Sequence, residues 1–167
     1  MDFSALAEAA KHGDAAAFAS LYSEVYKDMY KFAFYTLGHR EDAEDAVADA
    51  VTAAYGQIAR LKSAEAFRPW IFRILSNICR RTLKTYVHKT AELDEEIPCR
   101  EADFTENAVI RAVFGCLAEE ERLIISMHIF GGYTSREIGK ILHMNAATVR
   151  SKESRALKRL KGGENLL

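Results

Sequence analysis

The chain has 167 residues, a length that suits one ordinary domain or two very small ones. Hydrophobic residues make up 49% of it and charged residues 28%, which is typical of a folded globular protein rather than a disordered one. No apolar run approaches the ~20 residues that a membrane span needs, and the first residues do not resemble a basic, apolar signal peptide. We therefore expect a cytoplasmic protein without membrane insertion. The formal net charge of −1, taken alone, gives no sign of a nucleic-acid partner.

The distribution of charge along the chain indicates more than its sum. Residues 1–59 carry a net charge of −6, residues 60–90 carry +7, residues 91–121 carry −8 and residues 133–167 carry +5. Two separated basic segments are typical of a protein that binds a polyanion at two places. Charged runs also occur on solvated helix faces, so the position of the charges within each predicted element decides between these interpretations.

Apolar residues recur at helical spacing through almost the whole chain, which predicts an all-α protein. We expect a short first helix that ends at Gly13 and a second helix that begins after Asp14 and stops near Gly38. A third helix is predicted from about Asp42 to Ile58. A fourth begins at Pro69, a residue favoured in the first turn, and continues to about residue 86.

The third predicted helix carries a cluster of carboxylates in its first two turns, namely Asp42, Glu44, Asp45 and Asp49. Carboxylates near a helix N-terminus complement its dipole, but four of them exceed what capping requires. The surplus indicates docking to a basic protein surface. No His, Glu or Asp elsewhere stands at a matching helical spacing, so we expect no catalytic residue, no metal site and no cofactor.

The fourth predicted helix has two distinct faces. One is apolar and the other mixes an aromatic ring, cations and an amide at steps of three or four residues; its members are Trp70, Arg73, Asn77, Arg80, Arg81 and Lys84. Such a stripe suits single-stranded nucleic acid, because bases stack on aromatic or guanidinium planes while cations follow the phosphates. The alternative is that Trp70 is only a core anchor. The preceding loop, with Arg60 and Lys62, is a candidate receptor for an unstacked base.

Helical periodicity fails between about residues 91 and 107, where the chain is acidic and is broken by Pro98. We expect an exposed linker here. The predicted architecture is a helical domain over residues 1–90, the acidic linker over 91–107 and a second helical domain over 108–167. Because the linker and the basic faces have opposite charges, a self-inhibitory contact between them is a further expectation.

The second domain carries the pattern of a helix-turn-helix. Thr134 and Glu137 form a capping box at the start of a short helix, residues 143–145 form a turn, and Asn145 can cap a basic helix. The side chains predicted to face DNA are Thr134, Arg136, Thr148, Arg150, Ser151, Lys152, Ser154, Arg155 and Lys158. A helix of this kind can place arginine forks and short hydroxyls at base edges in the major groove. A helical hairpin inside a bundle explains the apolar spacing equally well, but it explains the concentrated cations and hydroxyls less well.

In this order, the motifs resemble those of bacterial RNA polymerase sigma factors, specifically the compact extracytoplasmic-function group. Residues 42–49 are similar to the core-binding helix of region 2, and residues 67–77 are similar to its promoter-melting helix. Residues 117–122, 132–134 and 148–152 resemble region 4.

The resemblance implies a non-catalytic subunit that binds core RNA polymerase and directs promoter recognition, DNA melting and transcription initiation. It implies that Asp42, Asp45 and Asp49 dock on the clamp helices of the β′ subunit. The stripe of the fourth helix, with Arg60 and Lys62, would hold the −10 element open. The helix-turn-helix residues would read the −35 element, next to a contact with the β flap, and an anti-sigma factor is an implied partner.

Two other hypotheses remain from the residues alone. One is a conventional helix-turn-helix regulator whose N-terminal domain dimerises or senses a ligand. The other is a helical adaptor without a DNA role. A conventional regulator binds duplex operator unaided, commonly as a dimer on a palindrome, whereas a sigma factor acts with core polymerase.

Three positions depart from the pattern of the sigma factor group. Ala48 stands where glutamine is usual, which thins the predicted polymerase-binding surface, and Ala118 replaces a common proline. Glu153 occupies a normally apolar, inward position between Val149 and Ala156. Because an isolated buried carboxylate is costly, we expect Glu153 to reach a cation or the domain edge.

The three cysteines are odd in number and widely spaced, so they predict neither a disulfide framework nor a zinc site. We expect Cys79 and Cys116 to be small core residues and Cys99 to be exposed in the linker. Their spacing gives no support for a redox switch.

Overall fold

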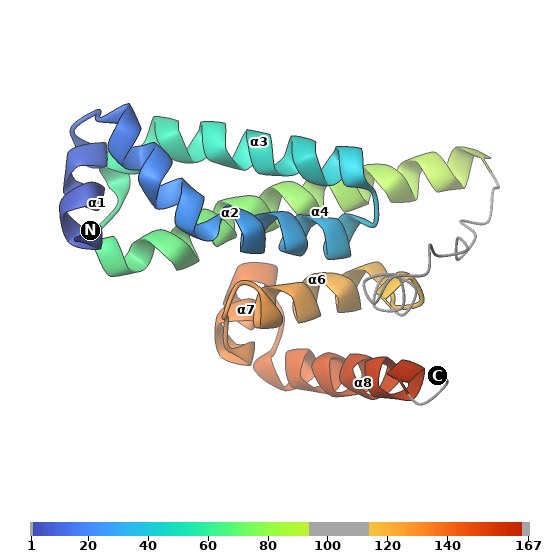
Figure 1. Cartoon of the computed structure of the whole chain (residues 1–167). Helices are drawn as coiled ribbons and strands as arrows, with labels where there is room; N and C mark the ends of the chain where they lie inside the picture. Colours follow the sequence, from blue (N-terminus) through green and yellow to red (C-terminus); the bar gives the residue numbers. More distant parts are fainter. Residues whose placement is uncertain (1, 94–113, 165–167) are drawn as a thin grey trace.

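The structure is a computed structural model that describes residues 2–93 and 114–164 (Figure 1). All regular secondary structure in these two ranges is helical, which confirms the predicted all-α class. The α-helices are α1 (Phe3–Lys11), α2 (Ala15–Leu37), α3 (Arg40–Gln57), α4 (Phe67–Leu93), α6 (Glu119–Ile129), α7 (Ser135–Leu142) and α8 (Ala146–Glu164). Two short 3₁₀ turns, η1 (Ile58–Arg60) and η2 (Ala64–Ala66), connect α3 to α4.

Both ends of α2 follow the predicted capping residues. A carboxylate oxygen of Asp14 accepts hydrogen bonds from the backbone N–H groups of Ala16 and Ala17, at 2.9 and 3.0 Å. At the other end of α2, Gly38 has a positive φ of 76°, a left-handed conformation that residues with a Cβ rarely adopt. The short turn that follows sends α3 back along α2, and the two helices pack together over much of their length.

Helices α2, α3 and α4 enclose the core of the N-terminal half. Phe32, Phe67 and Phe72 are fully buried, and the rings of Phe32 and Phe72 meet edge to face at 5.8 Å. Helix α3 contributes mainly alanines to this core, among them Ala43 and Ala50, which are fully buried. Small side chains allow a helix to approach its neighbours closely, so α3 presents its polar residues to solvent on a firmly packed base.

Helix α4 is longer than the sequence predicts at both ends. It begins at Phe67, two residues before Pro69, because the buried Phe67 ring anchors the first turn. Pro69 is still tolerated, since the N–H groups of the first turn have no intrahelical acceptor. The helix continues through Leu93 rather than stopping near residue 86, as no proline or glycine occurs before Pro98. Most of the predicted linker lies outside the described residues, and so does any contact between the linker and the basic faces.

Helices α7 and α8 form the predicted helix-turn-helix. The Thr134 hydroxyl accepts from the backbone N–H of Glu137, and the Glu137 carboxylate accepts from the backbone N–H of Thr134, so the capping box is confirmed. Asn145 accepts from the backbone N–H of Ala147 at 2.9 Å and caps α8 as predicted. The turn is tight: a Cβ on Gly139 would lie 2.7 Å from the carbonyl oxygen of Met144.

The C-terminal helices pack directly on the N-terminal bundle. Helix α6 lies against α2 and α4, and α8 forms the outer layer beyond it (Figure 1). Ile124 and Met127 of α6 are fully buried in the same hydrophobic core as the residues of α2 and α4. Tyr35 of α2 stacks on Phe130 with ring centroids 5.5 Å apart. The two halves therefore share one interface in this closed arrangement.

One of the cysteine predictions is confirmed and one is wrong. Cys79 is fully buried, and this burial raises the pKa of its thiol to about 12. Cys116 is exposed, because Phe114 and Leu117 take the inward positions on either side of it. Cys99 lies outside the described residues. No helix in the described ranges has the length and apolar character needed to cross a bilayer.

Candidate nucleic-acid and partner interfaces

The polar stripe predicted on α4 lies on the side of the helix that faces away from the core of the N-terminal bundle. Arg73, Asn77, Arg81 and Lys84 are exposed, whereas Ile71 and the neighbouring core positions are fully buried. This division follows from the helical repeat, which places residues three or four apart on one face.

Trp70 packs on the hydrophobic core and is also partly exposed. Its ring packs on Phe67 with centroids 6.2 Å apart and borders the hydrophobic core, yet the residue is only half-buried. The core contact holds the ring in place and leaves part of it in solvent, at the start of the basic stripe. Such a fixed ring is suited to stacking, because little conformational freedom remains to be lost on binding.

The loop before α4 presents its two cations to solvent. Leu61 is buried, and its backbone N–H donates to the carbonyl of Ile58 at 3.0 Å. This anchor fixes the middle of the loop, and Arg60 and Lys62 on either side of it are exposed. The loop therefore presents exposed cations just before the start of α4, and its predicted role as a receptor for an unstacked base stays a prediction.

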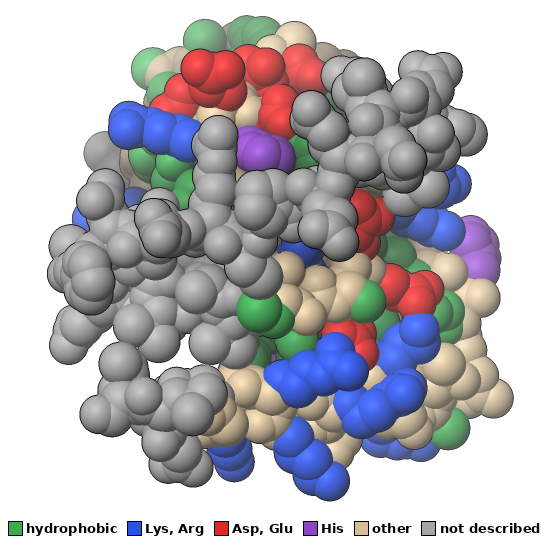
Figure 2. All heavy atoms as spheres, turned by 90° about the vertical axis from the view of Figure 1, so that its right-hand side faces the viewer, with side chains coloured by type: hydrophobic (Ala, Val, Ile, Leu, Met, Phe, Trp, Pro, Cys, Tyr) green, Lys and Arg blue, Asp and Glu red, His purple; other side chains and the backbone are tan. Residues whose placement is uncertain are grey.

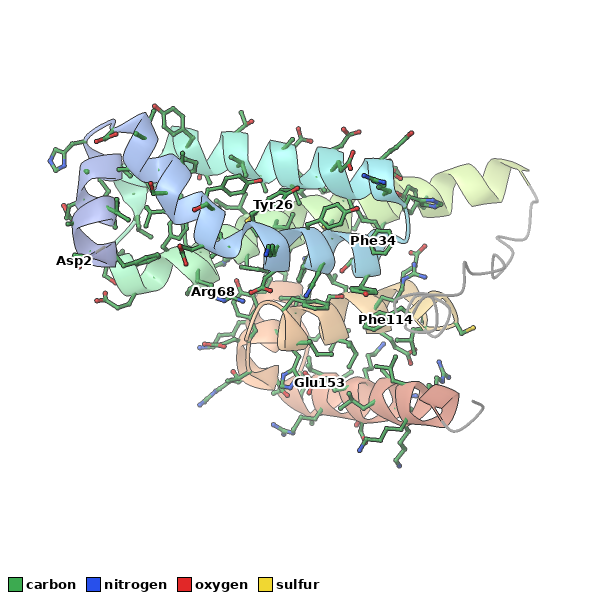
Figure 3. The ribbon with its side chains drawn as sticks, in the orientation of Figure 1. Asp2, Tyr26, Phe34, Arg68, Phe114 and Glu153 are labelled. Atoms are coloured by element: carbon green, nitrogen blue, oxygen red, sulfur yellow. The ribbon has the colours of Figure 1, made fainter. Side chains whose placement is uncertain are left out.

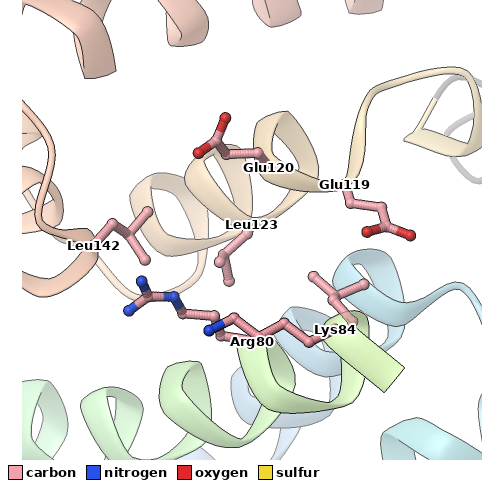
Figure 4. Close-up of a pocket in the computed structure, with 7 residues that line it drawn as sticks. Arg80, Lys84, Glu119, Glu120, Leu123 and Leu142 are labelled. Carbon is pink, nitrogen blue, oxygen red and sulfur yellow. The ribbon is translucent and has the colours of Figure 1, made fainter. Parts of the chain in front are cut away.

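The far end of the stripe faces the C-terminal half. Arg80 and Lys84 line a cavity of about 160 Å³ between α4, α6 and α7, together with Leu83, Glu119, Glu120, Leu123 and Leu142 (Figure 4). A guanidinium N–H of Arg80 donates to the carbonyl of Ile141 at 3.5 Å. In the closed arrangement, Arg80 and Lys84 therefore lie beside the acidic side chains of α6, with Arg80 partly buried and Lys84 still exposed.

Two further contacts join the start of α4 to the turn after α6, and the sequence did not indicate either. Arg68 donates to the Asp28 carboxylate at 2.9 Å and to the carbonyl of Phe130 at 2.7 Å, with its guanidinium 5.0 Å above the Phe72 ring (Figure 3). The Tyr133 hydroxyl donates to the carbonyl of Pro69. Burial raises the pKa of Tyr133 well above that of a solvated tyrosine, so its hydroxyl stays a donor.

The acidic surface of α3 is only partly free. Asp45 and Asp49 are exposed, and Glu44 pairs with Arg40 at 3.1 Å. Asp42 is half-buried and accepts a hydrogen bond from the Tyr86 hydroxyl of α4. Figure 2 shows the acidic side chains gathered over the N-terminal end of α3, on the opposite side of the molecule from the cations of α8.

The exposed side of α8 carries most of the predicted DNA contacts. Thr148, Arg150, Ser151, Ser154, Arg155 and Lys158 are exposed, as is Arg136 of α7. Arg150, Ser151, Ser154 and Arg155 line a shallow hollow with Ala147. Short side chains thus alternate with two guanidinium groups over two turns of the helix. Thr134 is also exposed, but its hydroxyl is engaged in the helix cap.

Lys152 lies differently from the other predicted residues of α8. Its ammonium group donates to the Glu120 carboxylate of α6, and its side chain is 24% exposed. Arg159, which sequence reasoning missed, pairs with Glu121 of α6 at 2.9 Å. Both pairs fasten α8 to α6. The acidic cluster at residues 119–121 is visible in the sequence, but nothing there indicates its partners.

Glu153 is buried at the centre of the C-terminal half, on the side of α8 that faces α6 and α7 (Figure 3). Its Oε2 accepts from the Ser135 hydroxyl at 2.8 Å, and its Oε1 lies 3.7 Å from Nδ1 of His128. Of the two expected outcomes, a position at the domain edge is wrong, and the nearby cation is His128, which is charged only when it is protonated. The hydrogen-bond partner is a hydroxyl rather than a Lys or Arg, with an imidazole at a longer distance.

No group of three or more His, Cys, Asp or Glu side chains within residues 2–93 and 114–164 is arranged to hold a metal ion. The sites that the structure builds are instead extended surfaces, two basic and one acidic.

Two family models match this chain: Sigma-70 region 2 over residues 21–88 and Sigma-70 region 4 over residues 113–162. Among curated relatives, the RNA polymerase sigma factor NccH of Alcaligenes xylosoxydans is 30% identical over 169 residues, covering 93% of this chain and 91% of NccH. The ECF RNA polymerase sigma factor SigM of Mycobacterium tuberculosis is 28% identical over 152 residues, covering 89% of this chain and 77% of SigM.

Solved structures share the fold. CnrH, solved in complex with the cytosolic domain of CnrY, superposes with a TM-score of 0.67 at 20% identity and 99% coverage of both chains. The sigma factor RpoE of Bartonella quintana, solved with the anti-sigma factor NepR, gives a TM-score of 0.71 at 19% identity, covering 89% of this chain and 96% of RpoE. With both sigma-70 regions matched in order and a relative at 30% identity over nearly the full chain, the protein belongs to the extracytoplasmic-function group of bacterial RNA polymerase sigma factors.

Proposed function

We propose that this sigma factor joins core RNA polymerase through α3, holds a melted −10 element on α4 and reads a −35 element with α8. The observation that supports this most directly is the pair of basic faces on different helical units, with an exposed acidic face on a third helix. It acts as a non-catalytic specificity subunit in the cytoplasm. Its working units are residues 1–90 and 108–167, joined by the linker at 91–107.

The −10 contact is proposed for the α4 stripe and the loop before it. A partly exposed, firmly held Trp70 offers a stacking surface for a base, and Asn77 can hydrogen-bond a base edge freed from its partner strand. Arg73 and Arg81 carry fixed charge along the path of the phosphates. The loop cations at Arg60 and Lys62 extend this path at its upstream end.

The −35 contact is proposed for α8, with its first turns in the major groove. This groove is about 12 Å wide and admits one helix. Arg150 and Arg155 are the exposed guanidinium groups that can take two acceptors of a guanine, and the hydroxyls of Ser151 and Ser154 lie between them. Lys158, further along the helix, is placed to contact a phosphate.

The acidic face of α3 is proposed to dock on the basic clamp helices of the polymerase β′ subunit, mainly through Asp45 and Asp49. Asp42 contributes less, because its carboxylate is already engaged by Tyr86. Residues around the helix-turn-helix would contact the β flap. CnrH and RpoE were both solved with bound regulatory partners, one of them named an anti-sigma factor, so an anti-sigma factor is also proposed for this chain.

The closed arrangement cannot engage both promoter elements at once. Elements centred about 25 base pairs apart, as −10 and −35 imply, lie about 85 Å apart on straight duplex DNA. A compact chain of this length has a radius of gyration of about 15 Å. We infer that α6, α7 and α8 leave the N-terminal bundle when the holoenzyme binds a promoter, which also uncovers Arg80 and removes Glu119 and Glu120 from beside Arg80 and Lys84.

Reconstituted transcription tests this proposal. The chain is added to core polymerase, and initiation is mapped on a library of genomic fragments, with core polymerase alone as the control. We expect specific start sites that require both components and weak promoter binding by the chain alone. Tight binding to a palindromic duplex without polymerase, together with no affinity for core enzyme, would instead establish a conventional helix-turn-helix regulator.

A further inference from the structure

Glu153 is a buried acidic residue of α8 that is hydrogen-bonded to α7 and lies close to a side chain of α6. It lies between Val149 and Ala156, which are fully buried, and is itself only 8% exposed. Its Oε2 accepts from the hydroxyl of Ser135, the first residue of α7, at 2.8 Å. Its Oε1 is buried, has no hydrogen-bond partner within the described residues and lies 3.7 Å from His128 Nδ1, near the end of α6.

A carboxylate at this position is not the choice that stability alone favours. An apolar side chain of similar volume would pack between Val149 and Ala156 without leaving a buried oxygen unsatisfied. The contacts that such a side chain makes are non-directional, so they restrict the rotation of α8 on α7 less sharply than a hydrogen bond does. A hydrogen bond is directional, so it restricts this rotation to a narrower range.

The rotation of α8 matters because its inner side packs on α6 and α7, whereas its outer side carries the proposed DNA contacts. Glu153 lies on the inner side, and Ser151 and Arg155, two residues before and after it, lie about 160–200° away on the outer side. Any rotation or translation of α8 on α7 therefore moves the outer side chains relative to the major groove of the DNA. Recognition by a guanidinium fork depends on position, since both N–H groups must meet their acceptors together.

We propose that Glu153 is a positioning residue for promoter recognition: its bond to Ser135 sets the rotation of α8 on α7 and so sharpens discrimination among −35 sequences at a cost in stability. The inference rests on the proposed −35 role of α8 and deepens it. The ion pairs of Lys152 and Arg159 with α6 hold the same helix, but these residues are 24% and 56% exposed on flexible side chains and fix its rotation less.

The test uses holoenzyme reconstituted from core polymerase and the full-length chain. Wild-type holoenzyme first selects −35 sequences from promoter fragments randomised in that region. Discrimination is then the affinity of the holoenzyme for the selected fragment divided by its affinity for each single-base variant of that fragment. The variants are Glu153→Leu, Ser135→Ala, the double variant and Glu153→Gln, whose amide oxygen still accepts from Ser135. The Tm of each free chain is measured alongside.

We expect Glu153→Leu to raise Tm and Ser135→Ala to lower it, while both reduce discrimination by about three- to tenfold. The double variant should discriminate no worse than Glu153→Leu, because the two residues act through one bond. Glu153→Gln should keep wild-type discrimination. If Glu153 had a purely structural role, discrimination would rise and fall with Tm. A loss of discrimination in both single variants, with Tm raised in one and lowered in the other, would exclude such a role.

Wild-type discrimination in Glu153→Leu, or a loss in Glu153→Gln as large as that in Glu153→Leu, would overturn the inference. The Arg150→Ala variant separates this failure from failure of the −35 role itself. If Arg150→Ala loses discrimination while Glu153→Leu does not, only the positioning role is wrong. If neither changes it, and Arg155→Ala does not change it either, α8 does not read the −35 element and both proposals fall.

Discussion

At the scale of single residues, exposure separates the side chains that can meet DNA from those that hold the fold. Arg150 is exposed at the first turns of α8, whereas Lys152, two positions later, is committed to Glu120 of α6. Asn77 is exposed in the middle of the α4 stripe, with no burial to restrict its amide. These differences make Arg150 and Asn77 the sharpest single-residue probes of the two basic faces.

Replacing Arg150 by alanine should cost about 1–3 kcal/mol of promoter binding and relax preference at one −35 position, if its guanidinium contacts a base. Binding of holoenzyme to single-base variants of the −35 element measures this. Lys158→Ala is the matched control from the same helix and should weaken binding equally on every sequence. An equal loss on every sequence for Arg150→Ala would reclassify Arg150 as a phosphate contact.

Replacing Asn77 by alanine should impair strand opening and leave affinity for core polymerase unchanged, because Asn77 lies on the exposed side of α4 and not among the exposed carboxylates of α3. Permanganate reactivity of −10 thymines reports opening, and titration of labelled chain with core enzyme reports affinity. Thr85→Ala, an exposed position one helical turn or more beyond the proposed base contacts, serves as the control. Normal permanganate reactivity in Asn77→Ala would remove Asn77 from the melting site.

At the scale of secondary-structure elements, the two faces of a helix were predictable and its exact ends were not. The caps at Asp14, Thr134 and Asn145 involve partners two or three residues away, so the local sequence contains both members of each bond. The extension of α4 to Phe67 also depends on distant partners, because the Phe67 ring packs on Phe3 of α1 and Phe18 of α2 as well as on the neighbouring Trp70, and the local sequence does not indicate those distant contacts.

The exposed carboxylates of α3 are predicted to contribute to the affinity for core polymerase. Charge reversal of an exposed carboxylate, Asp45→Lys or Asp49→Lys, should weaken core-polymerase binding by about tenfold, because like charges would face each other across the interface. Asp42→Asn should have a smaller effect on binding, since the Asp42 carboxylate is engaged by Tyr86. The Kd for core enzyme at low and high salt measures both. A larger loss for Asp42→Asn than for the two reversals would place the docking surface elsewhere.

At the scale of the whole molecule, the packing of α6 on α2 and α4 is the feature that could not be predicted from the sequence. Arg68 and Phe130 are 62 positions apart, and the apolar spacing of α6 is equally consistent with a core confined to the C-terminal half. Ile124 and Met127 of α6 are buried against α2 and α4 as well as against their own half. Periodicity identifies a buried face without identifying what covers it.

Weakening this interface should favour the open form. Tyr133→Phe removes the hydrogen bond to Pro69 and should shift the balance between closed and open forms by about 1 kcal/mol, roughly fivefold. Small-angle scattering should show a larger mean radius, and binding of the free chain to −35 duplex should rise. Tyr26→Phe, at a 45% exposed position on α2, is the control. An unchanged radius would mean that the Tyr133 hydroxyl does not hold the halves together.

The two ion pairs between α6 and α8 also set how this helix responds to ionic strength. Of the six cations of α8, Lys152 and Arg159 are already neutralised by protein carboxylates. Within the described residues, the other four, Arg150, Arg155, Lys158 and Lys161, form no such pair. If each of the four displaced one condensed counterion from duplex DNA, α8 would contribute no more than about −4 to the slope of the logarithm of −35 affinity against the logarithm of salt concentration. By pairing with two cations of α8, Glu120 and Glu121 of α6 reduce the part of the DNA affinity that depends on salt and not on base sequence.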